Sequence, residues 1–335
     1  MTQYKKVVSF TINRHDGAAQ YDFEIHNALR KQSNDYSFEI EDVNKHVSLP
    51  RFLALIIFWI RAQYILFFKH IDIAIVSPSI MLIYPKRISI ISVSHHYDPS
   101  VFRGLKFIYV KLCHWLFICQ RSRVNLVVTP SKYWRSYYKE KGFKNVVTIF
   151  NGFDVESMDR AIVKLDSSTV LKKLNLVSKK YFHLGSYGIA KGQKKVFKHL
   201  KHLGFPMVLT SSSKYTPKNG IKDLKLINAN FEEYNILLKN AKAVICMSEF
   251  KEGWCRVLHE AAIHGTPILG SGLGGMKELL EIGGFSNTTI DTLHNDLNIC
   301  TKKDSLSRNA INLYREFTLE KFHMSWRNCV NELLK

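Results

Sequence analysis

The chain has 335 residues, of which 46% are hydrophobic, and its formal net charge is +20. This length allows two domains of ordinary size, and the apolar content excludes a largely disordered chain. The charge indicates a polyanionic partner: nucleic acid, an anionic membrane surface or phosphorylated substrates.

The N-terminal part predicts alternating strands and helices. A β-branched strand over residues 5–13 precedes a helical pattern over residues 20–31, and Gly17 lies in the loop between them. A glycine loop after a first strand is where nucleotide-binding folds often contact their ligand. Two further β-branched runs, Ile71–Val76 and Ile88–Ser94, predict the next strands.

The segment Phe52–Phe68 is apolar except for Arg61 and Gln63 near its middle. Its uninterrupted apolar part is about half of the roughly twenty residues that a membrane-spanning helix needs. A central arginine adds about 2.5 to 3.5 kcal/mol to the cost of insertion. We therefore expect a helix buried against a sheet, with contact at a membrane interface as the alternative.

Two adjacent histidines, His95 and His96, follow the predicted strand Ile88–Ser94. Neighbouring residues of an extended chain point in different directions, so the two form a poor metal pair. Loop histidines that hydrogen-bond to the backbone are the alternative to a ligand-binding role. Either histidine is a candidate for a ligand-binding role.

Basic and aromatic residues are concentrated in two predicted helices, over residues 104–119 and 131–141. Between Val101 and Asn145 the chain has ten Lys or Arg residues and one acidic residue. Such a composition suits an anionic membrane interface, and it could also bind single-stranded nucleic acid. Because no nucleic-acid motif accompanies it, we expect a membrane surface and no nucleic acid; a solvated basic face is the remaining alternative.

The first half ends with two strands, over residues 125–129 and 146–150, and the turn Asn151-Gly152-Phe153-Asp154. A polar stretch with helical character over residues 155–178 is interpreted as a linker. We expect one domain over 1–154 and a second over 179–318.

The second half begins with a strand over 181–185, after which Lys191 lies at the start of a helix. Further elements are expected at 206–212 (strand), 231–239, 305–317 and 319–334 (helices). In the last helix Trp326 lies on an apolar face with helical spacing.

Residues 243–281 predict strand, loop, helix, strand, glycine loop and helix. The first helical pattern opens at Glu252-Gly253 and stops at Gly265-Thr266-Pro267. The glycine loop is 270–275. Two helix N-termini next to neighbouring parallel strands can hold a phosphate or diphosphate, and glycines let the backbone approach it.

In this stretch Glu252 and Glu260, within EGWCRVLHEAAIHGTPILGSGLGG, resemble the donor-binding signature of the family-four retaining glycosyltransferases. The resemblance implies a GT-B fold: two Rossmann-like α/β domains that face each other across a cleft, with the final helix, 319–335, crossing back onto the N-terminal domain. The turn at Asn151–Asp154 and Lys191 fit this pattern. Asp16-Gly17-Ala18 fits it only partly, and Ser186 stands where the family has an arginine.

This resemblance implies that the protein transfers a hexose from a nucleotide-diphosphate sugar to a hydroxyl acceptor. The basic, aromatic N-terminal half leads us to expect a lipid-linked or polysaccharide acceptor, in lipopolysaccharide, O-antigen or capsule synthesis. Glu252 would hold the sugar, Glu260 the ribose and Lys191 the diphosphate. No Asp-x-Asp occurs, so no metal or other cofactor is expected. The alternatives are an inactive, membrane-bound homologue and a sugar-nucleotide epimerase. The implied catalytic residues are His96, Lys191 and Glu252, and the implied donor-binding residues are Gly17, His95, Ser186, Gly253, Trp254, Cys255, Arg256, Glu260, Gly274 and Gly275.

The expected location is the cytoplasm, on the inner face of the cytoplasmic membrane. The N-terminus shows no signal-peptide core. The six cysteines show neither Cys-x-x-Cys nor zinc-like spacing, which is typical of reduced thiols in a cytosolic protein.

Overall fold

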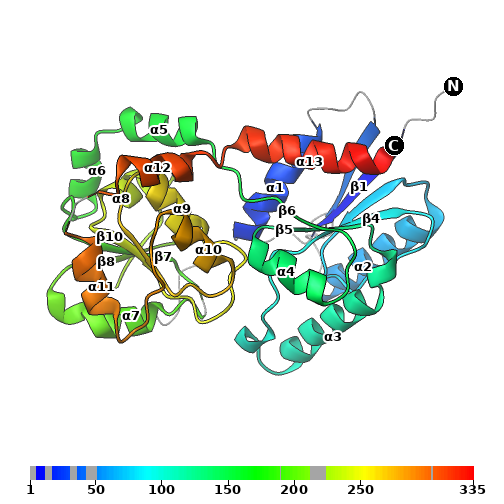
Figure 1. The fold of residues 1–335 in the computed structure, drawn as a ribbon, viewed down its shortest axis with the longest axis horizontal. Helices are drawn as coiled ribbons and strands as arrows, with labels where there is room; N and C mark the ends of the chain where they lie inside the picture. The colour runs from blue at the N-terminus through cyan, green and yellow to red at the C-terminus, as the bar shows by residue number, and fades with distance from the viewer. Residues whose placement is uncertain are drawn as a thin grey trace. The chain divides into compact units, whose positions relative to one another are not determined.

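The computed structural model describes residues 5–11, 17–30, 36–42, 51–188, 190–211, 224–302 and 305–335. The chain forms two compact units, each built around its own parallel sheet (Figure 1). Unit 1 comprises Met1–Gly152 with Leu319–Lys335, and unit 2 comprises Phe153–Thr318. The predicted α/β class is confirmed.

The sheet of unit 1 has the strand order β2-β1-β3-β4-β5-β6, with all neighbours parallel. Its central strands are β-branched and buried along their length, as expected for a sheet that is covered on both faces. The chain proceeds from β1 to β2 on one side and returns to β3 on the other side of β1, so the strand order reverses between β1 and β3. The strands are β1 (Lys5–Thr11), β2 (Tyr36–Asp42), β3 (Ile73–Val76), β4 (Ser89–Val93), β5 (Leu126–Thr129) and β6 (Val146–Thr148).

Helices cover both faces of this sheet. On one face α1 (Gly17–Arg30) packs against α13 (Leu319–Leu334), where Trp326 is fully buried. The apolar spacing of this last helix in the sequence predicts its observed bounds closely. The opposite face carries α2 (Arg51–Phe68), α3 (Leu105–Cys119) and α4 (Lys132–Glu140), with short 3-10 turns η2 (Pro99–Val101) and η3 (Arg121–Arg123).

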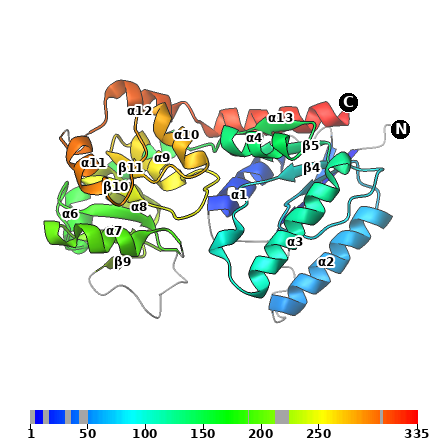
Figure 2. The same cartoon turned by 60° about the horizontal axis from the view of Figure 1, so that its bottom comes forward.

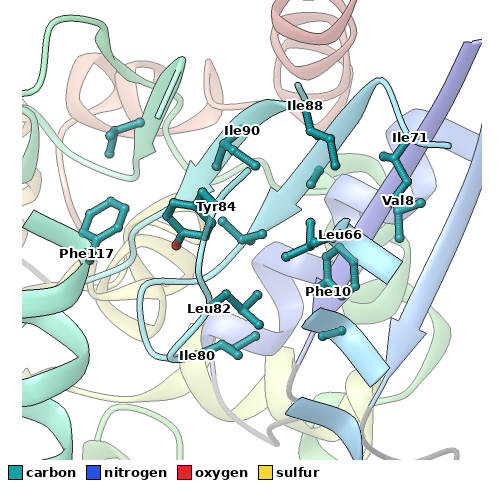
Figure 3. Packing of buried hydrophobic residues seen from close by; sticks show 14 of the residues in the cluster. Val8, Phe10, Leu66, Ile71, Ile80, Leu82, Tyr84, Ile88, Ile90 and Phe117 are labelled. Atoms are coloured by element: carbon teal, nitrogen blue, oxygen red, sulfur yellow. The ribbon is translucent and has the colours of Figure 1, made fainter. Parts of the chain in front are cut away.

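Figure 3 shows the core beneath α2 and α3, where Phe10 of β1, Leu66 of α2 and Phe117 of α3 converge on the sheet. The segment 80–84 adds Leu82 and Tyr84 to the same core. α2 is therefore buried along one side, as the first interpretation of Phe52–Phe68 expects. Among the residues described, no helix is both long and apolar enough to span a bilayer.

The sheet of unit 2 has the order β11-β10-β7-β8-β9, again with parallel neighbours. Its strands are β7 (Phe182–Ser186), β8 (Met207–Thr210), β9 (Lys225–Ile227), β10 (Ala243–Cys246) and β11 (Ile268–Gly270). The helices are α5 (Val155–Lys164), α6 (Ser167–Lys173), α7 (Gln193–Leu200), the 3-10 turn η4 (Lys201–Leu203), α8 (Phe231–Asn240), α9 (Arg256–Ile263), α10 (Gly275–Ile282), α11 (Leu293–Cys300) and α12 (Arg308–Arg315).

The stretch 155–178, interpreted from the sequence as a linker, forms α5 and α6, and both helices pack on α8 within unit 2. Met158 and Leu171 are buried there. Lys164 pairs with Glu232 at 2.6 Å on the surface of this packing. These apolar contacts hold the stretch to unit 2.

Candidate active site

The strand order of unit 2 reverses at the boundary between β7 and β10, because the chain proceeds from β7 to β8 on one side and returns to β10 on the other. Ligands of open α/β sheets bind at such a switch point, beyond the carboxyl ends of the strands. The segments that leave these two ends, 187–192 and 247–255, carry Lys191 and Glu252.

The structure brings Lys191 and Glu252 together. The Lys191 ammonium donates to Oε1 of Glu252 over 2.5 Å, and the Ser248 hydroxyl donates to the same oxygen. Burial disfavours the charged form of Lys191, but the Glu252 carboxylate outweighs it and raises the pKa of the lysine above its usual value. The Lys191 ammonium also lies 4.9 Å from the centre of the Phe250 ring.

A second polar cluster surrounds Glu260 on α9. Arg256, one turn earlier, donates to its Oε1 over 3.2 Å, and the hydroxyl of the half-buried Tyr234 of α8 donates to its Oε2 over 2.7 Å. Both Arg256 and Glu260 are mostly buried, with 16% and 14% of their side chains exposed. The Arg256 guanidinium also stacks on Phe153, 4.4 Å from the ring centre. Glu260 is therefore held in one orientation.

The glycine loop is joined to the segment of Glu252 by a short parallel bridge between Glu252 and Gly274. The N–H of Glu252 donates to Leu273 O, and the N–H of Gly275 donates to Glu252 O over 2.8 Å. This pairing keeps Glu252 out of a helix, and α9 begins only at Arg256, with Cys255 as its N-cap. The predicted helix start at Glu252-Gly253 is therefore wrong, whereas α10 begins at Gly275, within one residue of the end of the predicted glycine loop.

Gly274 permits this close approach. Its φ is +69°, and a Cβ atom there would lie 2.5 Å from Glu252 O. We expect Gly274→Ala to lower the free energy of unfolding by about 2–4 kcal/mol, through left-handed strain and steric overlap. Gly284 has a φ of +75° with open space around it, so Gly284→Ala should cost only about 1–2 kcal/mol. Urea unfolding of both variants measures the difference, and equal costs would contradict the steric argument.

All three residues between Glu252 and Arg256 are buried: Gly253, Trp254 and Cys255. Trp254 donates from Nε1 to His259 Nδ1 over 3.0 Å, and His259 Nε2 lies 2.9 Å from Tyr314 O. A neighbouring Cys246 thiol, together with burial, raises the pKa of the Cys255 thiol well above its usual value. The side chains of Trp254 and Cys255 therefore lie in the packing beneath the loop.

Ser186 is exposed at the carboxyl end of β7. Its carbonyl accepts a hydrogen bond from Gln193 Nε2 over 2.6 Å, which ties the loop to the start of α7.

The remaining predicted site residues belong to unit 1. His95 is held by Asp22 of α1, with Nε2 3.0 Å from Oδ1, and stacks edge-on against Tyr21. His96 is exposed. Both histidines line a cavity of about 100 Å³ at the carboxyl ends of β3 and β4, together with Tyr97, Phe102, Tyr109 and His114. Gly17 is the first residue of α1, and Asp16 lies outside the described residues.

Ser248, Tyr234 and Asp22 are polar partners that sequence reasoning missed. Tyr234 is 26 residues from Glu260 and reaches it only because α8 packs against α9. In the portion of the chain that is described, no group of three or more His, Cys, Asp or Glu side chains is arranged to hold a metal ion.

No protein-family model and no curated protein sequence matches this chain. Several solved structures match this chain, and they show that its fold is GT-B. Sucrose-phosphate synthase from Thermosynechococcus elongatus aligns with a TM-score of 0.77 and 11% identity, covering 98% of this chain and 99% of that chain.

Two further structures are similar to this chain. HepE of Anabaena, in complex with UDP-glucose, aligns with a TM-score of 0.69 and 16% identity over 98% of this chain and 100% of that chain. UDP-N-acetylglucosamine 2-epimerase from Rickettsia bellii aligns with a TM-score of 0.65 and 15% identity over 99% and 97% of the two chains. At these identities the likeness establishes the fold.

Proposed function

We propose that the protein is a glycosyltransferase that moves a hexose from a nucleotide-diphosphate sugar to a hydroxyl acceptor, with retention of anomeric configuration. The supporting observation is the pair of clusters at the switch point of unit 2, Lys191 with Glu252 and Arg256 with Glu260. They combine cations for a diphosphate with carboxylates that can accept hydrogen bonds from sugar hydroxyls.

In this proposal Lys191 stabilises the negative charge that develops on the β-phosphate as the nucleoside diphosphate leaves, with help from N–H groups at the start of α10. When the donor binds, its diphosphate would replace Glu252 as the ion-pair partner of Lys191. The freed Glu252 carboxylate would then accept hydrogen bonds from the transferred sugar. Glu260 would hold the ribose. The leaving phosphate takes the acceptor proton, so no side-chain nucleophile is required.

A panel of radiolabelled nucleotide sugars tests the donor site. UDP-sugars come first, because HepE was solved with UDP-glucose. We expect wild type to bind one donor and Glu260→Ala to lose roughly 10- to 100-fold in affinity, since bonds to charged groups are worth about 1.5–3 kcal/mol. Glu281→Ala, at an exposed position of α10, is the matched control. The donor-site proposal fails if no nucleotide sugar distinguishes wild type from Glu260→Ala.

Tyr234 should act through Glu260. Tyr234→Phe removes the hydroxyl that fixes Oε2 and leaves the ring packed, so we expect a roughly 3- to 10-fold weaker Kd for the donor. Titration of the donor that binds in the panel measures the effect. A purely structural role would instead lower the thermal midpoint and leave the Kd of the folded protein unchanged.

We further propose that no divalent metal takes part, because Lys191 and the backbone N–H groups supply the positive charge at the diphosphate. Transfer measured with excess EDTA should retain its full rate. Loss of rate on chelation, restored by Mg²⁺ or Mn²⁺, would overturn this part of the proposal.

The proposed acceptor is a lipid-linked or polysaccharide hydroxyl in cell-surface glycan synthesis, reached from the cytoplasmic side of the membrane. Its support is the basic, aromatic surface of unit 1. Incubation with labelled donor and membrane extract should place label in the lipid or glycan fraction. NMR of the product then gives the anomeric configuration, and an inverted product would refute retention.

Two alternatives have specific observations behind them. The similarity to UDP-N-acetylglucosamine 2-epimerase favours a sugar-nucleotide epimerase, which would yield an epimerised donor without any acceptor. Ser186 favours an inactive homologue, which would bind donor but release no nucleotide. Analysis of the donor after incubation with and without extract separates the three functions.

A further inference from the structure

Helix α2 is apolar on both of its long sides. Ala54, Phe58, Ala62 and Leu66 recur every fourth residue and are buried against the sheet. A surface helix of a globular protein normally carries polar residues on the opposite side. Here that side is also apolar and exposed, with the residues Leu53, Ile56, Ile57, Ile60, Tyr64, Phe67 and Phe68.

The polar groups of α2 hydrogen-bond to the protein, and the Arg61 side chain is also 49% exposed. Arg61 donates from Nε and from a terminal nitrogen to the two carboxylate oxygens of Glu41, over 3.1 and 3.3 Å. Gln63 accepts from the Ile83 N–H over 3.1 Å, and Trp59 donates from Nε1 to Met81 O over 2.6 Å. The exposed surface of the helix is therefore mostly apolar, with the half-exposed Arg61 as its charged group.

Helix α3 presents a second exposed apolar stripe. Leu105, Ile108, Leu112 and Trp115 follow one another three or four residues apart, and they are between 44% and 86% exposed. The buried residues Cys113, His114 and Phe117 lie on the opposite side. An amphipathic helix of a monomeric domain normally has one apolar stripe, which is turned toward the core, and polar residues on its exposed side.

The two stripes belong to one surface. The segment 79–84 contacts α2 through Met81 and Ile83, and it contacts α3 through Ser79 O, which accepts from the Tyr109 hydroxyl over 3.3 Å. Ile83 is itself 50% exposed between them. Figures 1 and 2 both place α2 beside α3 on the same side of the sheet. We call the exposed apolar residues of α2 and α3, together with Ile83, the α2–α3 face.

Positive charge borders this face. Lys106 and Lys111 lie over the rings of Phe102 and Phe107, at 4.5 and 4.6 Å, and Lys69 lies over Tyr64 at 5.7 Å. Between Arg51 and Lys139 thirteen residues are Lys or Arg and two are acidic. Aliphatic stems that lie along aromatic rings place the ammonium groups at the rim of the apolar surface.

We propose that the α2–α3 face docks on an anionic lipid bilayer, with its apolar side chains in the interfacial region and its lysines against the headgroups. Exposed contiguous apolar surface of this kind marks a docking site. A second copy of the chain would bring two positive rims together, whereas anionic headgroups complement both the charge and the apolar surface. The inference does not depend on the donor chemistry.

Helix α4 exposes little apolar side chain. Trp134 and Tyr138 are buried in the core, and of its rings Tyr133 is 37% exposed. Of the two basic, aromatic helices that the sequence indicates, α3 is therefore the one with an exposed apolar stripe.

Flotation with vesicles of equal parts phosphatidylglycerol and phosphatidylcholine tests the proposal, at low and high salt. We expect wild type to bind these vesicles and not pure phosphatidylcholine. Replacing Ile60, Leu105 and Ile108 together by serine should lower the partition coefficient at least roughly tenfold. Lys106→Gln with Lys111→Gln should lower it about fivefold per lysine, an effect that disappears at high salt.

Matched controls come from unit 2. Val163→Ser with Ile299→Ser changes residues that are 86% and 57% exposed, and Lys198→Gln with Lys201→Gln removes the same charge from its surface. Both should bind vesicles as wild type does, and circular dichroism checks that all variants are folded.

Several outcomes would overturn the proposal: no vesicle binding at low salt, or full binding by the triple serine variant. A concentration-dependent dimer that the serine variant loses, without vesicle binding, would identify the face as an interface between copies. Because binding is measured without donor or acceptor, failure here leaves the proposed donor site and transfer chemistry untouched, although it removes the support for an acceptor at the membrane. Failure of the donor panel, in turn, leaves the docking proposal untouched.

Discussion

Lys191→Met is expected to lower the rate of sugar transfer by roughly two to three orders of magnitude, the usual cost of removing one group that stabilises charge in a transition state. Lys191 is the cation that the structure holds at the end of β7, where the strand order reverses, and Glu252 raises its pKa, so it stays protonated at neutral pH. Methionine keeps the length of the side chain and removes the charge. Steady-state kinetics with saturating donor measures the loss in kcat.

The same variant leaves the buried Glu252 carboxylate without its ion-pair partner, which costs about 3–5 kcal/mol of stability. A second variant separates the two effects. Lys191→Met with Glu252→Gln should recover the stability, because a neutral amide replaces the carboxylate, while the transfer rate stays low. Lys194→Met, at an exposed position of α7, controls for loss of a nearby charge. A fully active double variant would refute the catalytic role.

Unit 2 is expected to lose roughly 6 kcal/mol of stability between pH 7 and pH 5. Burial lowers the pKa of His183 and of His259 to about 3 and that of His264 to about 4, from an ordinary value of 6.5. The unfolded chain therefore binds three protons below pH 6.5 that the folded unit does not bind. Each contributes about 2 kcal/mol at pH 5.

The direction follows from proton uptake. Above pH 6.5 both states are neutral at these positions and the stability is complete. As the pH falls toward 4, the unfolded state is increasingly favoured. Because whole domains are commonly stable by only about 5–15 kcal/mol, we expect acid unfolding near pH 5. Urea unfolding at several pH values measures the slope of stability against pH.

His264→Gln provides the control for this prediction. Glutamine can still donate to Asn235 Oδ1, which lies 2.7 Å from His264 Nε2, but it does not titrate. We expect the slope between pH 6 and pH 4.5 to fall by about one third. An unchanged slope would mean that other groups govern acid unfolding.

Much of the fold was accessible from the sequence, because local periodicity reports burial. The last helix illustrates this, since the apolar spacing around Trp326 predicts its observed bounds. Strand β2 lies at a sheet edge, and it was missed even though Tyr36, Phe38 and Ile40 alternate with polar residues. The three-residue strand β9 and helix α11 were also missed.

The site was less predictable, because its contacts cross between elements. The pattern of glutamates and glycines identified Glu252, Glu260 and the glycine loop. The Lys191–Glu252 pair joins residues 61 positions apart, and Tyr234 reaches Glu260 from another helix. The start of α9 was misplaced by four residues because the bridge to Gly274, a long-range contact, holds Glu252 in an extended conformation.

The composition of unit 1 from two separate stretches of chain has a consequence for synthesis. Its helix α13 leaves the ribosome only after all of unit 2, and the pocket that receives Trp326 is lined by α1 and the sheet. Unit 2 is continuous in sequence, so it can complete its folding while translation is still in progress. The first unit to be translated is thus the last to be finished, and nascent chains that end before residue 319 would expose the apolar groove that α13 later fills.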